Sequence, residues 1–523
     1  DVFQYQTVQE LAAVTQNASD ADEFETEAPG TAIGPVPVTP IVAWLRDRVE
    51  DADPASIDGF HQSVLLRVPG GLGVDHLTNA LRAVLDHHDV LRLRLDRRGD
   101  TWQPVVQPTG TIDAAAAVHR VPVENGPFAD AVDRELRAAQ QRLDPRAGVM
   151  VQIIWFDAGS GKEGRLLVLA HHLVVDGVSW RIVLPDLVTA WASLVTGQAI
   201  TLDPVPTSFR RWAQRLVAEA ADPERVKELD LWTEILDGPN PGLAKRALDS
   251  RTDLADQAVS LSVTLPAEIT APLLTTVPAA FHGRVTDVLL TGLTLAVAHW
   301  RKHRGGRGTS VLLDLEGHGR EDIIPGLDLS RTAGWFTSIH PVRLDAGVTD
   351  WAEIRAGGPA AGNAIKKIKE QLREIPDNGI GFGLLRHLNP RTAQELADLP
   401  SPQLAFNYLG RVQADEGEWS IAPEALPGGE DPRMPITHLL EINAITRDRA
   451  GGPELVATWT WPDTLLAEAD VRELAEAWFT ALEGIVEHAR RDDTGGFTSS
   501  DLLVDLGQAE IDKLQEAWRN ERR

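Results

Sequence analysis

The sequence predicts an α/β protein of two lobes, each with a mixed β-sheet covered by helices. The chain has 523 residues, well beyond the roughly 100–200 residues of one domain. It is 43% hydrophobic and 24% charged, the balance of a globular protein with a substantial core. Segments with strand and helix patterns alternate in both halves of the chain, as expected when helices cover sheets.

The first 35 residues divide into two short segments. Residues 1–14 (DVFQYQTVQELAAV) carry apolar side chains at helical spacing, which predicts a short helix. Residues 15–35 are rich in Ala, Glu, Asp and Pro without periodicity, as is typical of a linker. A short helix followed by a linker indicates the end of an upstream domain.

The expected first lobe covers residues 36–205. Thr39 and Pro40 are residue types of an N-cap and a first helical position, so a helix is predicted to begin there. An amphipathic stretch over Asp75–Leu85 predicts a second helix, and apolar spacing after residue 177 predicts a third, kinked at Pro185. Strands are predicted at Ser63–Val68, Val149–Trp155 and Arg165–Ala170.

The remaining chain is predicted to contain connecting helices and a second lobe. Residues 206–250 are charged and contain tryptophan, which indicates helices that join the two halves. The second lobe is expected at 251–515, followed by a tail at 516–523. Its predicted strands are Ala258–Leu265, 311–315 and 455–461, and its predicted helices are Thr286–His299 and 467–489.

The composition excludes several classes of function. Acidic residues (77) outnumber basic ones (50), and the formal net charge of −27 disfavours binding to nucleic acid or to an anionic membrane. The chain has no cysteine, which excludes disulfides, thiolate nucleophiles, iron–sulfur clusters and cysteine zinc sites. The sequence contains neither a run of about 18–20 apolar residues nor a signal-peptide pattern, so we expect a cytoplasmic protein.

The first segment with candidate chemistry is AHHLVVDGVSW at 170–180. An apolar strand precedes it, so His171 and His172 point to opposite faces, and one can face a cavity while the other is packed. Asp176 and Gly177 then turn the chain into the next helix. On spacing alone, a metal site and two satisfied core histidines both stay open, although adjacent strand histidines chelate one ion poorly.

A second segment, DLEGHGRED at 314–322, places Glu316 at the end of a strand. Gly317 precedes His318 and permits a turn that other residues resist. A carboxyl group there can act as a general base if burial raises its pKa; the alternative is a Glu–Arg turn on the surface. Tyr408, at the end of another predicted strand, either donates to a developing oxyanion or packs.

Taken in order, these motifs resemble those of epimerization domains of non-ribosomal peptide synthetases, members of the condensation-domain superfamily. HHxxxDGxSW is matched by His171–Trp180, EGHGRE by Glu316–Glu321 and FNYLG by Phe406–Gly410. Ordinary condensation domains share the first motif but are not expected to carry the other two. Further matches are Pro40, Ile41, Trp44, Asp287, Leu289, Leu290, Arg331–Pro341 and Gly379–Gly383, and the departures are Ala43, Leu45, His340 and Arg411.

The resemblance implies a fold and a reaction. The fold is two chloramphenicol-acetyltransferase-like lobes in a V-shaped pseudo-dimer with a central tunnel. The reaction converts an L-aminoacyl or L-peptidyl thioester to a D/L mixture by removing and returning the α-proton. The domain itself binds no cofactor, because the substrate is carried on the 4′-phosphopantetheine of a carrier domain.

The resemblance also implies partners. Residues 1–14 resemble the last helix of a peptidyl carrier domain, which would act upstream in cis. A downstream condensation domain would accept the D-configured donor. The chain is expected to be monomeric and to need neither nucleic acid nor a membrane.

Residue roles follow from the same resemblance. His172 and Glu316 are the two acid/base groups, and which of them removes the L-proton stays open. In an alternative that also stays open, His172 stabilises the enolate charge while Glu316 and a water molecule transfer the protons. Asn407 and Tyr408 are expected near the thioester oxygen. Asp176 is expected to orient the structure by pairing with Arg92, and His171 to pack. The residues expected to shape the site are Gly177, Trp180, Gly317, His318 and Arg320, and those expected to line the tunnel are Trp335, Phe336, Thr337, Ser338, Gly381 and Phe382.

Two other functions stay open. A condensation domain joins two carrier-bound groups and needs the histidine motif but not Glu316. A non-catalytic domain of the same fold recruits a partner enzyme and is expected to have a degraded HHxxxDG motif, which is intact here.

Overall fold

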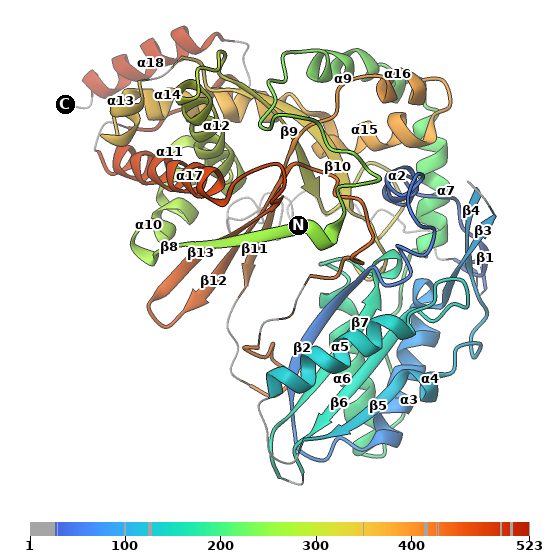
Figure 1. Cartoon of the computed structure of the whole chain (residues 1–523). Coiled ribbons are helices and arrows are strands. Elements are labelled where there is room, and N and C mark those ends of the chain that lie inside the picture. The colour runs from blue at the N-terminus through green and yellow to red at the C-terminus, as the bar shows by residue number, and fades with distance from the viewer. Residues whose placement is uncertain are drawn as a thin grey trace.

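The computed structural model describes residues 27–521 apart from 29, 99–100, 124–127, 160, 349, 413–416, 425, 427, 492–493 and 503–505. The predicted helix at 1–14 lies outside these residues, as does most of the predicted linker at 15–35. The described chain forms two lobes, each with its own sheet and helices (Figure 1). The predicted two-lobed α/β fold with mixed sheets is therefore confirmed.

The N-terminal lobe is built on a four-stranded sheet in the order β2-β7-β6-β5. Strand β7 pairs antiparallel with both β2 and β6, whereas β5 and β6 are parallel. Every residue of β6 is buried because helices cover both faces of the sheet. The strands are β2 (His61–Val68), β5 (Val118–Pro122), β6 (Val151–Asp157) and β7 (Gly164–His171).

Helices α3 and α6 pack on one face of this sheet through residues such as Leu81 and Leu187, and α5 packs on the other through Leu136. Pro185 lies inside α6, which continues through it to Val195. A small antiparallel sheet, β1-β4-β3, completes the lobe. The bounds are α3 (Val74–His87), α4 (Ala114–Ala117), α5 (Phe128–Arg142), α6 (Trp180–Val195), β1 (Gly34–Pro35), β3 (Leu93–Arg98) and β4 (Thr101–Val106).

The C-terminal lobe is built on a six-stranded sheet in the order β10-β9-β11-β12-β13-β8. Strand β11 is parallel to both of its neighbours, and the other pairs are antiparallel. The strands are β8 (Ala258–Leu265), β9 (Ser310–Gly317), β10 (Ser338–Asp345), β11 (Leu404–Val412), β12 (Leu440–Arg449) and β13 (Gly452–Pro462).

Helices α12 (Val285–His303) and α17 (Glu468–Ala489) cover one face of the six-stranded sheet. Trp478 of α17 packs against Phe406 and Trp459 of the strands. The face of β11 that carries Phe406 therefore faces the core, and the alternate residues of that strand point away from α12 and α17. This second face carries the candidate site residues of the lobe.

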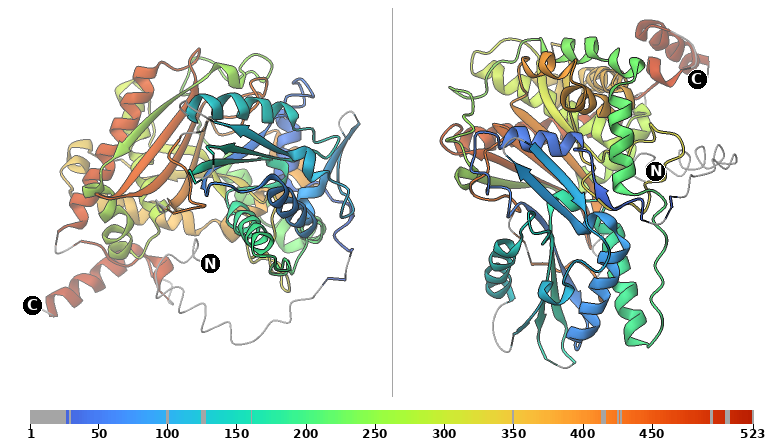
Figure 2. Two further views of the ribbon diagram at one scale, coloured as in Figure 1. Left: turned by 90° about the horizontal axis from the view of Figure 1, so that it is seen from below. Right: turned by 90° about the vertical axis from the view of Figure 1, so that its right-hand side faces the viewer.

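Three helices over residues 209–236 connect the lobes, a short helix at Pro40–Arg48 belongs to the first lobe, and the other helices surround the second sheet. Helix α7 (Phe209–Ala220) packs on the N-terminal core through Trp212, and α9 (Leu229–Leu236) packs beside β10. Helix α18 lies at the periphery (Figure 2). It runs across residue 515, the predicted boundary between the second lobe and the tail at 516–523. The other helices are α2 (Pro40–Arg48), α8 (Pro223–Val226), α10 (Ala267–Leu274), α11 (Thr276–Phe281), α13 (Trp351–Arg355), α14 (Pro359–Arg373), α15 (Ile380–Gly383), α16 (Ala393–Ala397) and α18 (Gln508–Glu521).

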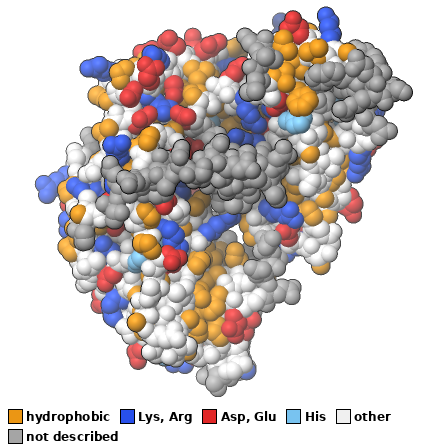
Figure 3. Space-filling view, turned by 180° about the vertical axis from the view of Figure 1, so that it is seen from behind, with side chains coloured by type: hydrophobic (Ala, Val, Ile, Leu, Met, Phe, Trp, Pro, Cys, Tyr) orange, Lys and Arg blue, Asp and Glu red, His pale blue; other side chains and the backbone are white. Residues whose placement is uncertain are grey.

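The described basic side chains form no continuous stripe on the face of the molecule shown in Figure 3. On the face seen in Figure 3, the described Lys and Arg side chains are scattered among acidic and apolar ones rather than gathered in a stripe. Among the described residues, no helix has both the length and the apolar character that crossing a membrane requires.

A buried ion pair joins the lobes. Asp176 follows β7 in the first lobe, and Arg320 follows β9 in the second. The Arg320 guanidinium donates to both carboxylate oxygens of Asp176, at 2.7 and 3.1 Å, and the two side chains are only 8% and 5% exposed. The backbone N–H groups of Ser179 and Phe336 also donate to this carboxylate. Asp176 is thus bonded to segments of both lobes.

This geometry corrects the expected pairing of Asp176 with Arg92. Arg92 is buried and donates to the backbone oxygens of Leu85, Asp86 and Gln107, so it caps the end of α3. Helix C-termini leave carbonyl groups without partners, and a guanidinium satisfies several of them at once. Arg320 binds Asp176 because the EGHGRE turn reaches across from the other lobe.

A second connection is a segment of the C-terminal lobe that crosses to β2, described at residues 417–424 and 428–438. Ala422 donates to the backbone oxygen of Leu65, and Trp419 to that of Arg67. His61 donates to the oxygen of Gly429, and a Cβ atom at Gly429 would lie 1.6 Å from the His61 oxygen. Only glycine fits at this approach of two backbones.

Substitution of Gly429 is expected to weaken this crossing. Gly429→Ala places a methyl group against the backbone of β2, where strain of about 1–3 kcal/mol is expected, and the melting temperature falls. Gly428→Ala is the matched control, because a Cβ at that neighbouring glycine meets nothing within 4 Å. Equal melting temperatures for the two variants would contradict the close approach at Gly429.

A double-mutant cycle tests the ion pair. We expect Asp176→Asn and Arg320→Gln to be coupled by about 0.5–3 kcal/mol in the free energy of unfolding, because the first change already leaves Arg320 without its carboxylate. The Asp176→Asn and Arg92→Gln pair serves as the control and should be additive. Coupling to Arg92 but not to Arg320 would restore the pairing expected from the sequence.

Candidate active site

His172 stands at the end of β7, held between two aromatic rings. Its backbone N–H donates to the oxygen of Phe60 at 2.9 Å, which anchors the residue to the start of β2. The Phe60 ring stacks on the imidazole with 4.9 Å between centroids, and the Trp335 ring lies 4.5 Å away on a tilted plane. Burial lowers the pKa of His172, so the imidazole is neutral near pH 7.

His171, the preceding residue, is fully buried. Its Nε2 lies 2.8 Å from the oxygen of Ile57, and its Nδ1 accepts from the backbone N–H of Leu173. Burial lowers the pKa of His171 to about 3. Both ring nitrogens are used inside the protein, which fits the packing role expected for this residue.

Glu316 lies on the face of the six-stranded sheet that points away from α12 and α17. Asn407 of the neighbouring strand β11 donates its amide to Glu316 Oε2 at 2.8 Å. The Glu316 side chain is accessible to solvent, yet surrounding protein desolvates the carboxyl group and raises its pKa to about 7. Repulsion from Glu441 acts in the same direction. A carboxyl group with this pKa exchanges protons readily at neutral pH.

An imidazolium between two carboxylates borders this site. His438 Nε2 lies 2.8 Å from Asp314, which shares its face of β9 with Glu316, and Nδ1 lies 3.5 Å from Glu441. Burial alone would lower the pKa of His438, but the two carboxylates outweigh it and raise the pKa to about 10. The triad Asp314–His438–Glu441 therefore carries one net negative charge beside Glu316.

The EGHGRE turn brings the two halves of the site together. Gly319 has φ of +66°, and a Cβ there would lie 1.7 Å from the oxygen of Phe336, so the turn packs directly on the RTAGWFTS segment. Ile339 is paired with Glu316 in the sheet, and Trp335, four residues earlier, contacts His172. A chain of four residues spans at most about 14 Å. His172 and Glu316 are thus linked through one short segment.

Tyr408 is not where the sequence led us to expect it. It lies on the same face of β11 as Phe406 and packs against the core beneath α12 and α17. Its hydroxyl is 2.9 Å from that of the buried Thr446 on β12. Side chains alternate along a strand, so Asn407 shares a face with Glu316 whereas Tyr408 is on the other. The expected contact of Tyr408 with the thioester oxygen is corrected accordingly.

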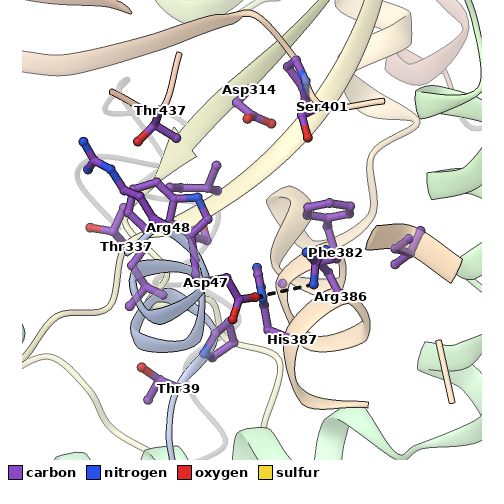
Figure 4. Close-up of a pocket in the computed structure, with 18 of the residues that line it drawn as sticks. Thr39, Asp47, Arg48, Asp314, Thr337, Phe382, Arg386, His387, Ser401 and Thr437 are labelled. Atoms are coloured by element: carbon purple, nitrogen blue, oxygen red, sulfur yellow. Dashed lines mark hydrogen bonds and ion pairs between the residues drawn. The ribbon is translucent and has the colours of Figure 1, made fainter. Parts of the chain in front are cut away.

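A cavity of about 340 Å³ lies next to these residues (Figure 4). Pockets of this size commonly hold small ligands. The expected tunnel residues Trp335, Phe336, Thr337, Ser338 and Phe382 line it, whereas Gly381 lies against Glu228. Asp314 and His438 also line it, but His172 and Glu316 do not.

The carboxylate of Asp47, on α2, lies at the edge of this cavity. It lies 3.2 Å from His387 and 3.7 Å from Arg386 (Figure 4). Asp47 comes from the first lobe, whereas His387 and Arg386 come from the second. The cavity therefore has walls from α2, from the start of β10 and from the chain around α15.

His87, His88 and Asp186 are the described residues whose donor atoms approach one another closely enough to hold a metal. Arg331, however, donates to both oxygens of Asp186 at 2.7 Å, and His88 lies 2.8 Å from the same carboxylate. A guanidinium in that position repels a cation, so the cluster is an ion-pair network.

Four residues beside the site were not predicted from the sequence. Asp314 was part of a quoted motif without a role, and His438, Glu441 and Gln62 belong to no motif. They reach the site only through the strand order and the crossing segment. A weak signal was available for Asp314, since residues two apart on a strand share a face with Glu316.

Comparison with known proteins agrees with this fold. Residues 50–491 match the family model described as the condensation domain. The chain is 34% identical, over 97% of its length, to one linear gramicidin synthase protein of Brevibacillus parabrevis, and 34% identical, over 99%, to chondramide synthase cmdD of Chondromyces crocatus. It spans only 6% and 13% of those proteins.

Solved structures share the two-lobed arrangement. The epimerization domain from the third module of tyrocidine synthetase B is 28% identical, with a TM-score of 0.76 over 88% of this chain and 99% of that one. The X-domain from teicoplanin biosynthesis is 21% identical, with a TM-score of 0.63 over 89% and 97%, which shows the fold alone. On its sequence and its fold, this chain belongs to the condensation domain family.

Proposed function

We propose that this chain epimerizes an aminoacyl or peptidyl thioester carried on the phosphopantetheine of a carrier domain, as part of a non-ribosomal peptide synthetase. The observation that carries the proposal is Glu316, a carboxyl group with a pKa of about 7, held by Asn407 and linked through Trp335–Ile339 to the neutral His172. The likeness to the tyrocidine synthetase epimerization domain supports it.

Epimerization at the α-carbon requires two proton-transfer groups. Inversion breaks the Cα–H bond, leaves its electron pair in an enolate and returns a proton to the opposite face. His172 and Glu316 come from different lobes, so they can approach an α-carbon from two sides. Near pH 7 the pair holds one proton that can be transferred to the substrate. That single proton, on either His172 or Glu316, suffices for reaction in either direction. Asn407, bound to Glu316, would orient the carboxyl group.

The substrate would enter through the cavity beside Trp335 and Phe382. Phosphopantetheine is a long, thin chain, and the cavity is walled by both lobes. A carrier domain upstream in cis would deliver it, and a downstream condensation domain would take the D-configured product. These partners rest on the likeness to synthetase proteins, of which the chain spans a small part.

A condensation reaction is the second candidate, because the chain matches the condensation domain family and retains the histidine motif. That reaction would leave Glu316 and Asn407 without a role. Two loaded carriers distinguish the candidates: peptide-bond formation without α-proton exchange would favour condensation. Failure of both reactions in the folded protein would favour a recruiting role.

Replacement of Glu316 tests the proposal. Glu316→Gln keeps the shape and the contact with Asn407 but cannot transfer a proton, so α-proton exchange in deuterated water should fall by about 10²–10⁴-fold. Exchange is measured on an aminoacyl-phosphopantetheinyl carrier, followed by chiral analysis of the released acid. Asp322→Asn, six residues further on and exposed, is the matched control and should retain activity. Undiminished exchange in Glu316→Gln would remove Glu316 from the mechanism.

The pH dependence gives a second test. Turnover in either direction requires one proton shared between His172 and Glu316, and that proton is lost as the pH rises through the Glu316 pKa of about 7. Exchange should therefore decline above about pH 7. Glu441→Gln removes a repelling charge, lowers the pKa of Glu316 and should move this decline to lower pH. A profile that is unchanged in Glu441→Gln would show that Glu316 does not set the decline.

A further inference from the structure

Gln62 links His172 to the first residue of helix α6. Its Oε1 accepts from the indole N–H of Trp180 at 2.8 Å, and its Nε2 lies 3.0 Å from His172 Nε2. Gln62 is the second residue of β2 and is paired with Ala170 of β7, so its position beside His172 is fixed by the sheet. The three side chains form one line of hydrogen bonds.

The indole fixes the direction of every bond in this line. An indole N–H can only donate, so the atom of Gln62 that faces it must be the amide oxygen. The Gln62 NH₂ group then faces His172, and an NH₂ group can only donate. His172 Nε2 must therefore accept, which requires a lone pair there and, in the neutral ring, the proton on Nδ1. Rotating the amide by 180° would place an NH₂ group against the indole N–H.

Nδ1 of His172 is enclosed by protein and has no hydrogen-bond partner within the described part of the chain. Backbone groups of His172 and Val175 act to raise the pKa of the ring against the effect of burial. The Gln62 amide occupies the other ring nitrogen, so the contact between Gln62 and Nε2 is the observation that assigns the proton to Nδ1.

We propose that Gln62, oriented by Trp180, is a positioning residue that holds His172 as a neutral imidazole with its proton on Nδ1 and its lone pair on Nε2. This inference rests on the proposed function only for its catalytic meaning. In this state Nε2 has no proton to give, and it can take one when its lone pair is released from the Gln62 amide. His172 would thus begin a turnover as the proton acceptor, with Glu316 holding the shared proton.

The same arrangement opposes a lasting imidazolium. A proton on Nε2 would face the Gln62 NH₂ group, and Trp180 prevents the amide from turning its oxygen to receive it. The other titratable groups that act on this ring are Asp176, which favours the charged form, and His61 and His171, which oppose it. Gln62 and the aromatic rings of Phe60 and Trp335 therefore act together to return His172 to its neutral form.

The tautomer can be measured without any substrate. In protein labelled with ¹⁵N-histidine, long-range ¹H–¹⁵N correlation spectra distinguish a protonated from an unprotonated ring nitrogen, and the His172 signals are those missing from His172→Asn. At pH 7 we expect Nε2 to be unprotonated and Nδ1 protonated. A proton on Nε2 in the wild-type protein would overturn the proposal, whatever reaction the chain catalyses.

Variants test whether Gln62 is the cause. Gln62→Glu offers oxygens to both Trp180 and His172, so Nε2 should become protonated at pH 7. Gln62→Met removes both bonds at similar length, and Trp180→Phe frees the amide to rotate; each should give a mixture of tautomers. Gln152→Glu, a buried glutamine of β6 bonded to His119, is the matched control and should leave the His172 signals unchanged. An unprotonated Nε2 in all three test variants would remove Gln62 from this role.

The rate profile supplies the functional measurement. In Gln62→Glu, α-proton exchange at pH 6 should fall by tenfold or more and recover at higher pH, since a carboxylate beside an imidazolium favours its charged form. A loss that is equal at every pH would indicate structural damage and contradict the positioning role. If the wild-type protein shows the expected tautomer but no exchange, the proposed function fails while the assignment of Gln62 stands.

Discussion

A carboxylate of one lobe and a guanidinium of the other meet out of water at Asp176 and Arg320. Removing two charges from solvent is costly, and the cost is recovered only while they remain in contact. His172 is four residues before Asp176, and Glu316 is four residues before Arg320. Any relative movement of the lobes that separated His172 from Glu316 would also pull this pair apart. The ion pair therefore sets the spacing of the site.

The pKa values of the two groups are shifted by different means. His172 is kept neutral by aromatic rings, burial and a donated hydrogen bond. Glu316 is kept partly protonated by desolvation and by the negative charge of the Asp314–His438–Glu441 triad. Each lobe thus supplies both a titratable group and the surroundings that shift its pKa.

Much of the fold could be predicted because local patterns fix it. Apolar alternation located β8 at its observed bounds, and the pattern after residue 177 located α6. Motif spacing likewise identified His172 and Glu316 as candidates. The predictions that were wrong depended on contacts between distant segments. The sequence does not show that Asp176 pairs with Arg320 rather than with Arg92, because Arg320 belongs to the other lobe. Tyr408 was assigned without knowing which face of β11 lies on the core.

The crossing segment at 417–438 has a consequence for how the protein is assembled. It belongs to the second lobe along the chain but hydrogen-bonds to β2, the outer strand of the first lobe's sheet. Without it, part of the backbone of β2 would be an open template for other strands, the usual starting point of aggregation. The N-terminal lobe is therefore not complete when its own sequence ends. More than 200 further residues must be synthesised after the N-terminal lobe before that edge is covered.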